Sequence, residues 1–517
     1  MPDVFALPPA VGKLAPLALA AMLAAAPACA ADWKFVPKLD LRETYSDNLS
    51  QLGNDSAQGG FISEAAPTVV VTATGRRLTL NAEANWRVYS YSNKDAPNLR
   101  DSDRRYSANA RATVVDELLF VDANASGSRQ AISAFGPVSG NGYSSTNSTD
   151  ISTWNIAPTL RHRFGSTADV TLRYARDSVD SGLGGFGTSL ASTRSADLNS
   201  GSAFTLIGWN LSYYSQALSD RVAGDSTSEN ATLGLRWNVV RRFGLTATAG
   251  YDKFDYPAFN QTTKGRSWTA GFVWNPSTRT SVQASYGRRY FGKTGSLTSS
   301  YRTQRSTWSA TYSDAITTSR SQFALPSALD TAAMLDGMFA ASFPDPVLRQ
   351  QAVQAYIAAS GLPTTLGNSI NYLSNRYIRV KHLQAAALFR GAKSSLALSI
   401  YQDQRNALST QQSDSLLLAG QLATLNDDTV QRGVSANADY RLSTRTNAFA
   451  SMNASRVRSL STDIVNNINE THIGLNHRFA AKTSGSLELR RSRGRYDLSS
   501  NGSYHENAVV ATFSVLY

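Results

Sequence analysis

The sequence has little charge, almost no cysteine and no long apolar segment beyond its first 30 residues. Of the 517 residues, 17% are charged, against about 25% in ordinary soluble domains. The single cysteine excludes a scaffold of disulfide bonds and a zinc site built from thiolates. No stretch after residue 30 approaches the roughly 20 consecutive apolar residues that a membrane-spanning helix requires. If the chain crosses a membrane, it must therefore do so as strands.

The first 30 residues predict a cleavable secretory leader. Lys13 precedes an apolar run over residues 14–26, and Ala28-Cys29-Ala30 then supplies a small-x-small cleavage pattern, so the mature protein is expected to begin at Ala31. The alternative is a lipoprotein acylated on Cys29, although the residues before it lack the usual leucine. In either case the chain leaves the cytoplasm.

Strict alternation of apolar and polar residues recurs along most of the remaining chain. Over residues 78–88 every second side chain is apolar and every intervening one is polar. A period of two indicates a strand with one apolar face and one polar face. Further copies begin near Tyr106, Ala168, Ala231 and Val434. Each copy has about the 9–11 residues that cross a bilayer as a tilted strand.

The expected connections between these strands alternate in length. Short ones occupy residues 115–117, 240–242, 275–278, 443–445 and 480–482, and the largest of the others occupy 130–149, 178–193 and 405–429. Outer-membrane barrels have short periplasmic turns, longer extracellular loops and aromatic girdles. Aromatic residues lie at expected strand ends, at Trp33, Tyr45, Phe164, Phe243, Trp274 and Phe479. A soluble sandwich or propeller would explain the alternation, but not the leader, the low charge and the unequal connections together.

The last strand carries the most specific signal. Val509, Phe513, Val515 and Tyr517 share one face, and the chain stops on the aromatic residue. This end resembles the signal by which the barrel assembly machinery recognises bacterial outer-membrane proteins. We therefore predict an all-β fold, a transmembrane antiparallel barrel of about 18–22 strands. Residues 366–373 supply a marginal strand that would bring 21 clear strands to 22. The lumen of such a barrel is an aqueous channel or is plugged.

Residues 321–363 interrupt the alternation with apolar residues at helical spacing. Asp345 is a suitable N-cap with Pro346 in the first turn, and Gly361 is a suitable stop. We predict a short helical insert, which counting the turns places on the periplasmic side. There it would fold into the lumen as a plug, dock a periplasmic partner or cap the rim.

Two glycine motifs do not predict a nucleotide site. Residues 287–294 fit GxxxxGK[ST], but they join two strands, whereas a phosphate loop needs a flexible turn before a helix. Residues 182–187 fit GxGxxG within a long loop that no helix follows. We expect no cofactor.

The histidines also fail to predict a metal or catalytic site. The sequence contains His162, His382, His472, His477 and His505, and they lack the spacing of zinc ligands. His162 and His477 lie on apolar faces, where either could pair with a neighbouring serine as in some barrel enzymes. Nothing in the sequence shows such a pairing, so we predict no catalytic residue and no metal.

The arginines are more informative, because strand register assigns them to a face. The polar faces carry Arg87, Arg111, Arg161, Arg163, Arg173, Arg236, Arg441, Arg478 and Arg490. Burying Lys or Arg against lipid at the midplane would cost about 2–4 kcal/mol, so these side chains should face the lumen. They could pair with Glu83, Asp169, Asp439 and Glu488 and stiffen the wall. The net charge of +12 favours instead a positive lumen that attracts anions.

The chain resembles the outer-membrane β-barrel proteins associated with PEP-CTERM/exosortase systems, which are encoded beside exopolysaccharide genes. The resemblance rests on WKFVPKLDLRETYSDNL at residues 33–49, FISEAAPTVVV at 61–71, WNPSTRTSVQASYGRRYFG at 274–292 and FPDPVLRQQAV at 343–353. It implies an outer-membrane barrel that serves polysaccharide export or surface-protein sorting, and it supplies no catalytic residues.

We therefore expect a non-enzymatic barrel in the bacterial outer membrane that acts as a channel or docking component for an anionic or neutral exopolysaccharide. The alternatives are a general porin-like pore for small anions and an outer-membrane hydrolase or acyltransferase. Because the strand pattern begins at Trp33, without an N-terminal plug domain before it, an energy-coupled transporter is not expected. Expected partners are outer-membrane lipid, the assembly machinery and polysaccharide export components, with no nucleic acid.

Overall fold

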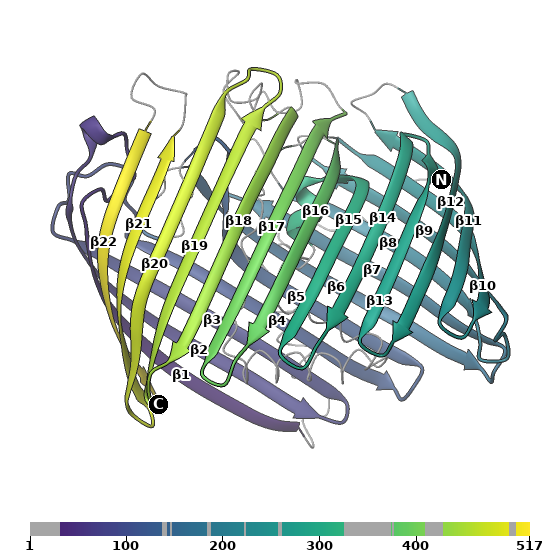
Figure 1. Ribbon diagram of the computed structural model, residues 1–517, viewed down its shortest axis with the longest axis horizontal. Helices are drawn as coiled ribbons and strands as arrows, with labels where there is room; N and C mark the ends of the chain where they lie inside the picture. Colours follow the sequence, from purple (N-terminus) through teal and green to yellow (C-terminus); the bar gives the residue numbers. More distant parts are fainter. Residues whose placement is uncertain are drawn as a thin grey trace, which may run out of the picture.

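The protein is a closed antiparallel β-barrel of 22 strands (Figure 1). The computed structural model describes residues 31–136, 142–144, 147–182, 188–221, 224–256, 261–324, 374, 377–408, 426, 428–495 and 503–517. Each strand pairs with its neighbours in the sequence, and β1 pairs with β22 to close the ring. The predicted fold class is confirmed, at the upper limit of the expected strand number.

The first half of the barrel consists of β1 (Ala31–Ser46), β2 (Gly60–Gly75), β3 (Leu78–Tyr91), β4 (Ser102–Val115), β5 (Leu119–Ala131), β6 (Ser148–Phe164), β7 (Ala168–Ser181), β8 (Thr188–Ser200), β9 (Ile207–Asp220), β10 (Ser226–Val240) and β11 (Phe243–Tyr256). The second half consists of β12 (Gln261–Ser277), β13 (Thr280–Arg289), β14 (Gly292–Arg302), β15 (Ser306–Thr318), β16 (Tyr377–Arg390), β17 (Ser394–Ala407), β18 (Asp428–Arg441), β19 (Thr446–Ser459), β20 (Val465–Ala480), β21 (Thr483–Arg495) and β22 (Ser503–Leu516). A 3₁₀ turn, η1 (Asn54–Ser56), and a short helix, α2 (Ser319–Ala324), lie in the connections.

Because alternate side chains of each strand point to opposite faces of the sheet, the alternating sequence gives the barrel an apolar outer wall and a polar inner wall. Outward side chains such as Trp86, Ile400 and Leu489 are 50%, 57% and 58% exposed. A band of exposed apolar side chains that circles the molecule is stable only against hydrocarbon. The chain is therefore a transmembrane barrel of the bacterial outer membrane. Within the described ranges, no helix is both long enough and apolar enough to cross a membrane.

The connections divide into two classes by side. Those that follow even-numbered strands are short, as at residues 76–77, 241–242 and 481–482, and by the usual rule they mark the periplasmic side. Those that follow odd-numbered strands include the long ones, at 47–59, 92–101, 132–147, 319–376 and 408–427. The loop predicted at 178–193 is shorter than expected, because β7 and β8 continue into it.

The predicted side of the helical insert is wrong. Fifteen strands precede residues 319–376, and the odd number puts this connection on the side of the long loops. The prediction counted one strand too few before the insert. All 22 strands form outside residues 366–373, so the marginal strand is not needed for the even number, and that segment lies outside the described residues.

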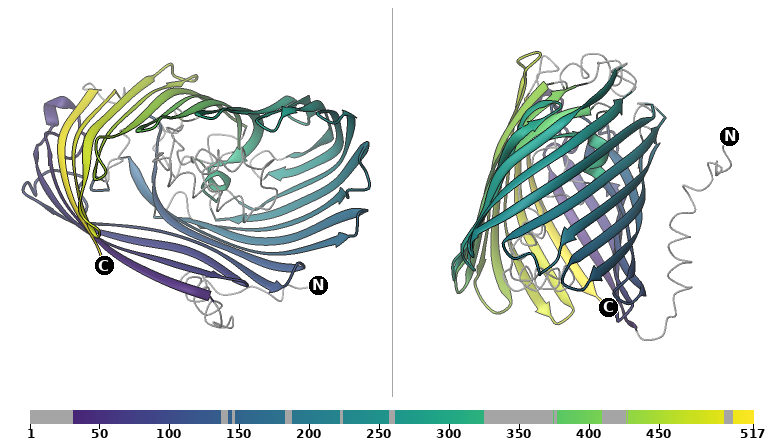
Figure 2. Two further views of the ribbon diagram at one scale, coloured as in Figure 1. Left: turned by 60° about the horizontal axis from the view of Figure 1, so that its bottom comes forward. Right: turned by 90° about the vertical axis from the view of Figure 1, so that its right-hand side faces the viewer.

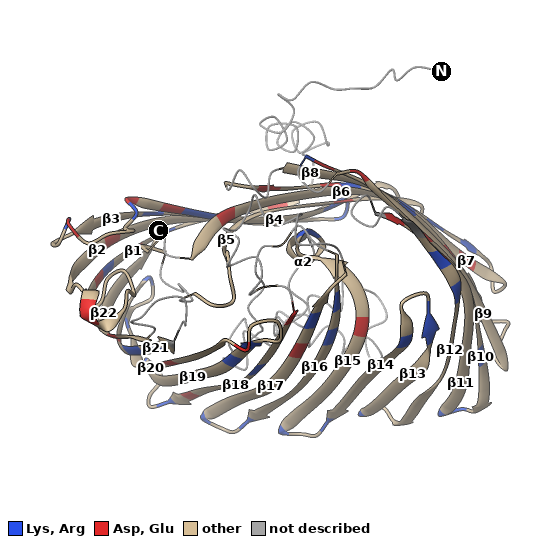
Figure 3. Cartoon of the chain, turned by 90° about the horizontal axis from the view of Figure 1, so that it is seen from above, with Lys and Arg blue, Asp and Glu red and all other residues tan. Residues whose placement is uncertain are grey.

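The beginning of the insert turns into the barrel. Helix α2 lies inside the ring of strands in the views of Figures 2 and 3, and it contacts β6 and β7 on the far wall. The predicted helix capped by Asp345 and the rest of residues 325–363 lie outside the described part of the chain.

The C-terminal residues form the closing strand. β22 pairs with β1 over nine positions, from Lys38↔Leu516 to Ser46↔Ala508. Val509, Phe513 and Tyr517 are 43%, 45% and 66% exposed on the outer face, and Val515 shares that face. The placement agrees with the predicted assembly signal, whose recognition remains a prediction.

Candidate functional site: the barrel lumen

The strand register places the predicted arginines on the inner wall. Each of the nine lies on the strand face opposite the exposed apolar series, as Arg87 does between the outward Trp86 and Val88. Their distribution along the wall therefore decides the charge of the lumen.

Four of these arginines are neutralised by carboxylates. The ion pairs are Arg87–Glu64 at 3.7 Å, Arg111–Asp122 at 2.6 Å, Arg163–Asp169 at 2.7 Å and Arg490–Glu506 at 2.7 Å. Of the partners expected from the sequence, Asp169 pairs with an arginine, whereas Glu488 contacts His472 at 2.7 Å. The inner wall is thus less positive than the net charge of the chain suggests.

The other five have no carboxylate partner within the described residues: Arg161, Arg173, Arg236, Arg441 and Arg478. The Arg161 guanidinium lies 5.8 Å from the centre of the Phe120 ring, and Arg236 Nε donates to Asn238 Oδ1 at 2.9 Å. These side chains are spread over both halves of the wall and do not form one anion site.

A buried cluster that sequence reasoning missed lies beside the seam between β1 and β22. The Glu506 carboxylate is fully buried and accepts hydrogen bonds from Ser46 Oγ at 2.9 Å, Gln51 Nε2 at 2.8 Å, the Tyr143 hydroxyl at 3.0 Å and Arg490 at 2.7 Å. Burial, and after it the Glu506 charge, raise the pKa of Tyr143 well above its usual value. The cluster fastens two long connections to the barrel wall.

Helix α2 is attached to the opposite wall. Arg320 at its start pairs with Asp177 of β7 at 2.5 Å and donates to Ser189 of β8 at 2.6 Å. Both side chains of the ion pair are nearly buried, at 6% and 10% exposed. Sequence alone provides no signal for this pair, because Arg320 lies in the connection after β15, where no strand register assigns it to a face.

Between α2 and the wall lies a cavity of about 910 Å³. Uncharged amide and hydroxyl groups dominate its lining, including Asn109, Asn124, Gln130, Asn155, Thr193 and Gln216. Among the described residues, its charged side chains are Arg173 and the Arg320–Asp177 pair. The Asn155 Oδ1 atom is buried and has no hydrogen-bond partner within the described residues. The cavity therefore offers many neutral hydrogen-bonding groups and little net charge.

The glycine and histidine motifs take ordinary structural roles where they are described. Residues 287–294 form the β13–β14 hairpin, as predicted, and residues 183–187 lie outside the described part. His477 contacts the Thr446 hydroxyl at 2.9 Å, and the ring of His162 lies 4.5 Å from that of Phe164. Within the described ranges, no group of three or more His, Cys, Asp or Glu could hold a metal ion.

Comparison with known proteins gives no family for the chain. No known family and no curated protein matches it. Among solved structures it is similar to the FrpB iron transporter of Neisseria meningitidis (F3-3 variant), at 11% identity and a TM-score of 0.47, over 94% of this chain and 82% of that one. It is also similar to the siderophore receptor PirA of Pseudomonas aeruginosa, at 11% identity and a TM-score of 0.39, over 94% and 80%. A third is a loop-deletion mutant of OmpT, an outer membrane protein of Vibrio cholerae, at 8% identity and 0.32, over 94% and 100%.

Proposed function

We propose that this outer-membrane barrel is a non-enzymatic channel or docking component for an exopolysaccharide, and that neutral sugar units contact the cavity between α2 and the wall. The observation that carries the proposal is the lining of that cavity by described residues, which is rich in amide and hydroxyl groups and nearly free of net charge. The resemblance to barrels of PEP-CTERM/exosortase systems, encoded beside exopolysaccharide genes, points to the same class of substrate.

The lining of the cavity suits a polysaccharide that must bind weakly and then pass through the lumen. Sugar hydroxyl groups both donate and accept, and they can exchange their bonds to water for bonds to Asn and Gln side chains. Each such exchange contributes only about 0.5–1.5 kcal/mol. Conduction requires binding that is strong enough for entry and weak enough for exit, which many weak contacts supply. The Asn155 Oδ1 atom, which accepts no hydrogen bond from any described residue, would accept one from such a hydroxyl.

Single-channel recording in planar bilayers tests the proposal. Maltohexaose should cause transient blocks of the current, and Asn124→Ala with Asn155→Ala should shorten them by about five- to thirtyfold, as loss of one or two net hydrogen bonds of about 1 kcal/mol each predicts. Asn437→Ala is the matched control, because Asn437 faces the lumen from β18 and does not line this cavity. Absence of sugar blocks, or equal shortening in the control, would contradict the proposal.

The five arginines that have no carboxylate partner in the described part of the chain favour a second candidate, a general pore for small anions. An open channel of this kind would show anion selectivity in the reversal potential across a salt gradient. Replacing Arg173 by Gln should lower that selectivity, and sugar should leave the current unchanged. Hydrolysis or acyl transfer by the purified barrel, measured on lipid and polysaccharide, would indicate the third function instead.

A further inference from the structure

Basic side chains recur on the outer wall mainly toward one end of the barrel, although among the described residues Arg194, the cross-strand partner of Tyr174, lies lower. On the lipid-facing side of the strands, they lie toward the connections that follow odd-numbered strands, as Arg176, Arg432 and Arg491 do. The apolar series begins one position further down the same face, with Tyr174, Val434 and Leu489 respectively. The side chains therefore lie just above the hydrocarbon, on the side of the long loops.

The densest group lies on four consecutive strands, β11 to β14. We define the outer basic patch as Lys253, Lys264, Arg266, Arg288 and Lys293, all of which are exposed. Strand pairing sets Lys253 opposite Lys264 and Arg288 opposite Lys293, while Arg266 follows two positions after Lys264. The five side chains thus share one continuous surface across neighbouring strands.

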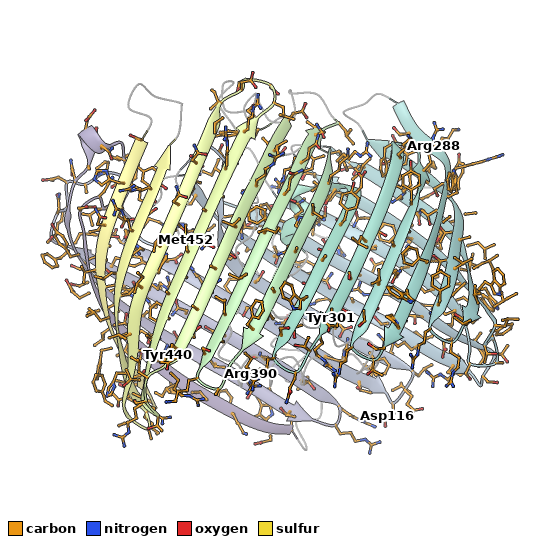
Figure 4. All side chains as sticks on the ribbon, in the orientation of Figure 1. Asp116, Arg288, Tyr301, Arg390, Tyr440 and Met452 are labelled. Atoms are coloured by element: carbon orange, nitrogen blue, oxygen red, sulfur yellow. The ribbon has the colours of Figure 1, made fainter. Side chains whose placement is uncertain are left out.

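Aromatic residues fix the height of this patch in the membrane. Tyr251 is the cross-strand partner of Arg266, and Trp268 is the partner of Arg288. Both aromatic side chains point outward and are 45% and 50% exposed. Tyr and Trp gather at the level of the lipid headgroups. Figure 4 shows Arg288 near the upper end of the barrel, far from Tyr301 and Tyr440 at its lower end.

The patch has more positive charge than its own neighbours neutralise. Glu229 and Asp255 share this face, so the surplus is 5 − 2 = 3 positive charges. Lys253 lies 3.8 Å from Glu229, and the other four basic side chains have no ion pair within the described residues. Like charges directly opposite each other on neighbouring strands destabilise a sheet. A bound anion at headgroup height would remove that repulsion.

We propose that the outer basic patch binds the phosphate groups of a phosphorylated glycolipid in the leaflet on the side of the long loops. Guanidinium groups match phosphate oxygens through paired N–H donors, and lysine adds further positive charge. The aromatic residues below would contact the upper parts of the acyl chains. This lipid site is independent of whatever passes through the lumen, because all five side chains point away from it.

Native mass spectrometry of the full chain in mild detergent tests the site, with bisphosphorylated lipid A as the probe. The triple variant Lys264→Gln, Arg266→Gln, Arg288→Gln should bind at least about tenfold more weakly, since each basic side chain near an anionic surface contributes roughly fivefold. Dephosphorylated lipid A should bind the unmodified protein as weakly as the variant binds lipid A. The charge-conserving variant Lys264→Arg, Arg266→Lys, Arg288→Lys should retain most of the affinity.

The matched control removes the same charge from the lumen, with Arg173→Gln, Arg236→Gln and Arg441→Gln, and should bind lipid A like the unmodified protein. Heat-modifiable electrophoretic migration shows that each variant is folded. Equal affinity for phosphorylated and dephosphorylated lipid would overturn the proposal, as would an equal loss in the lumen control. A change of oligomeric state in the patch variant, with lipid affinity intact, would assign the patch to a second copy of the chain and also overturn it.

Discussion

Replacing Glu506 by alanine should destabilise the barrel strongly, because it leaves a buried cation without its partner. The Arg490 side chain is only 12% exposed. Within the described residues it forms one ion pair, with Glu506 at 2.7 Å. Breaking a buried pair from one side costs about 3–5 kcal/mol. Ser46, Gln51 and Tyr143 would also lose an acceptor.

Two comparison variants distinguish the loss of the buried ion pair from non-specific destabilisation of the barrel. The double variant Glu506→Leu, Arg490→Met removes both charges, and such exchanges are often neutral or stabilising, so it should be more stable than Glu506→Ala alone. Asp463→Asn breaks an exposed pair, Arg458–Asp463 at 2.7 Å with side chains 53% and 75% exposed, and asparagine tolerates the positive φ of 61° at this position. Exposed pairs contribute about 0–1 kcal/mol, so this variant should unfold like the unmodified protein.

The assay is unfolding of the detergent-folded barrel in guanidinium chloride, followed by tryptophan fluorescence. The free energy of unfolding should fall by about 3–5 kcal/mol for Glu506→Ala and recover in the double variant. A loss below about 1 kcal/mol, the range of exposed pairs, would refute the reasoning, and so would a double variant that is less stable than the single one.

Three further predictions concern helix α2, a glycine in the β13–β14 hairpin and the Tyr143 hydroxyl. Arg320→Ala should break the contact of α2 with Asp177 and destabilise the attachment of α2 to the wall by about 3 kcal/mol. The single-channel conductance in planar bilayers should therefore rise. Unchanged conductance would show that α2 does not narrow the lumen. Gly287→Ala should lower the yield of folded barrel in refolding assays, because its Cβ would lie 1.9 Å from the Trp268 carbonyl oxygen, whereas Gly182→Ala meets no atom closer than 3.7 Å and should refold normally. The raised pKa of Tyr143 means that the protonated hydroxyl is the form that the fold stabilises. Stability should therefore fall as the pH rises above about 10, where an unfolded tyrosine ionises, and Tyr143→Phe should reduce that fall in unfolding midpoints measured between neutral and alkaline pH.

Much of the barrel could be predicted because the assignment of side chains to a strand face depends only on nearby residues in the sequence. A period of two assigns each side chain to a face without knowledge of its neighbours, and the predicted strand over residues 78–88 is indeed β3. The same rule placed Arg87 and Arg490 on the inner wall. It also predicted that residues 287–294 join two strands.

What the sequence could not provide depends on contacts between distant segments. The hydrogen bond between Tyr143 and Glu506 joins residues 363 positions apart, and Arg320 meets Asp177 across 143 positions. No periodic pattern encodes such contacts, since they arise only when a connection folds back into the lumen. The prediction of the insert's side failed for a different reason. A single missed strand reverses the predicted direction of every later strand, and so the predicted side of every later connection.

Closure of the ring through its first and last strands has a consequence for biogenesis. The Arg42 Nε to Thr512 contact spans 470 residues, so the two free sheet edges can meet only when the whole polypeptide has been made. Any shorter chain would expose unpaired backbone donors and acceptors at both margins, which invites aggregation and cannot be tolerated within a bilayer. The polypeptide should thus cross the periplasm unfolded and bound to chaperones. It should reach its native form only when the first and last strands pair.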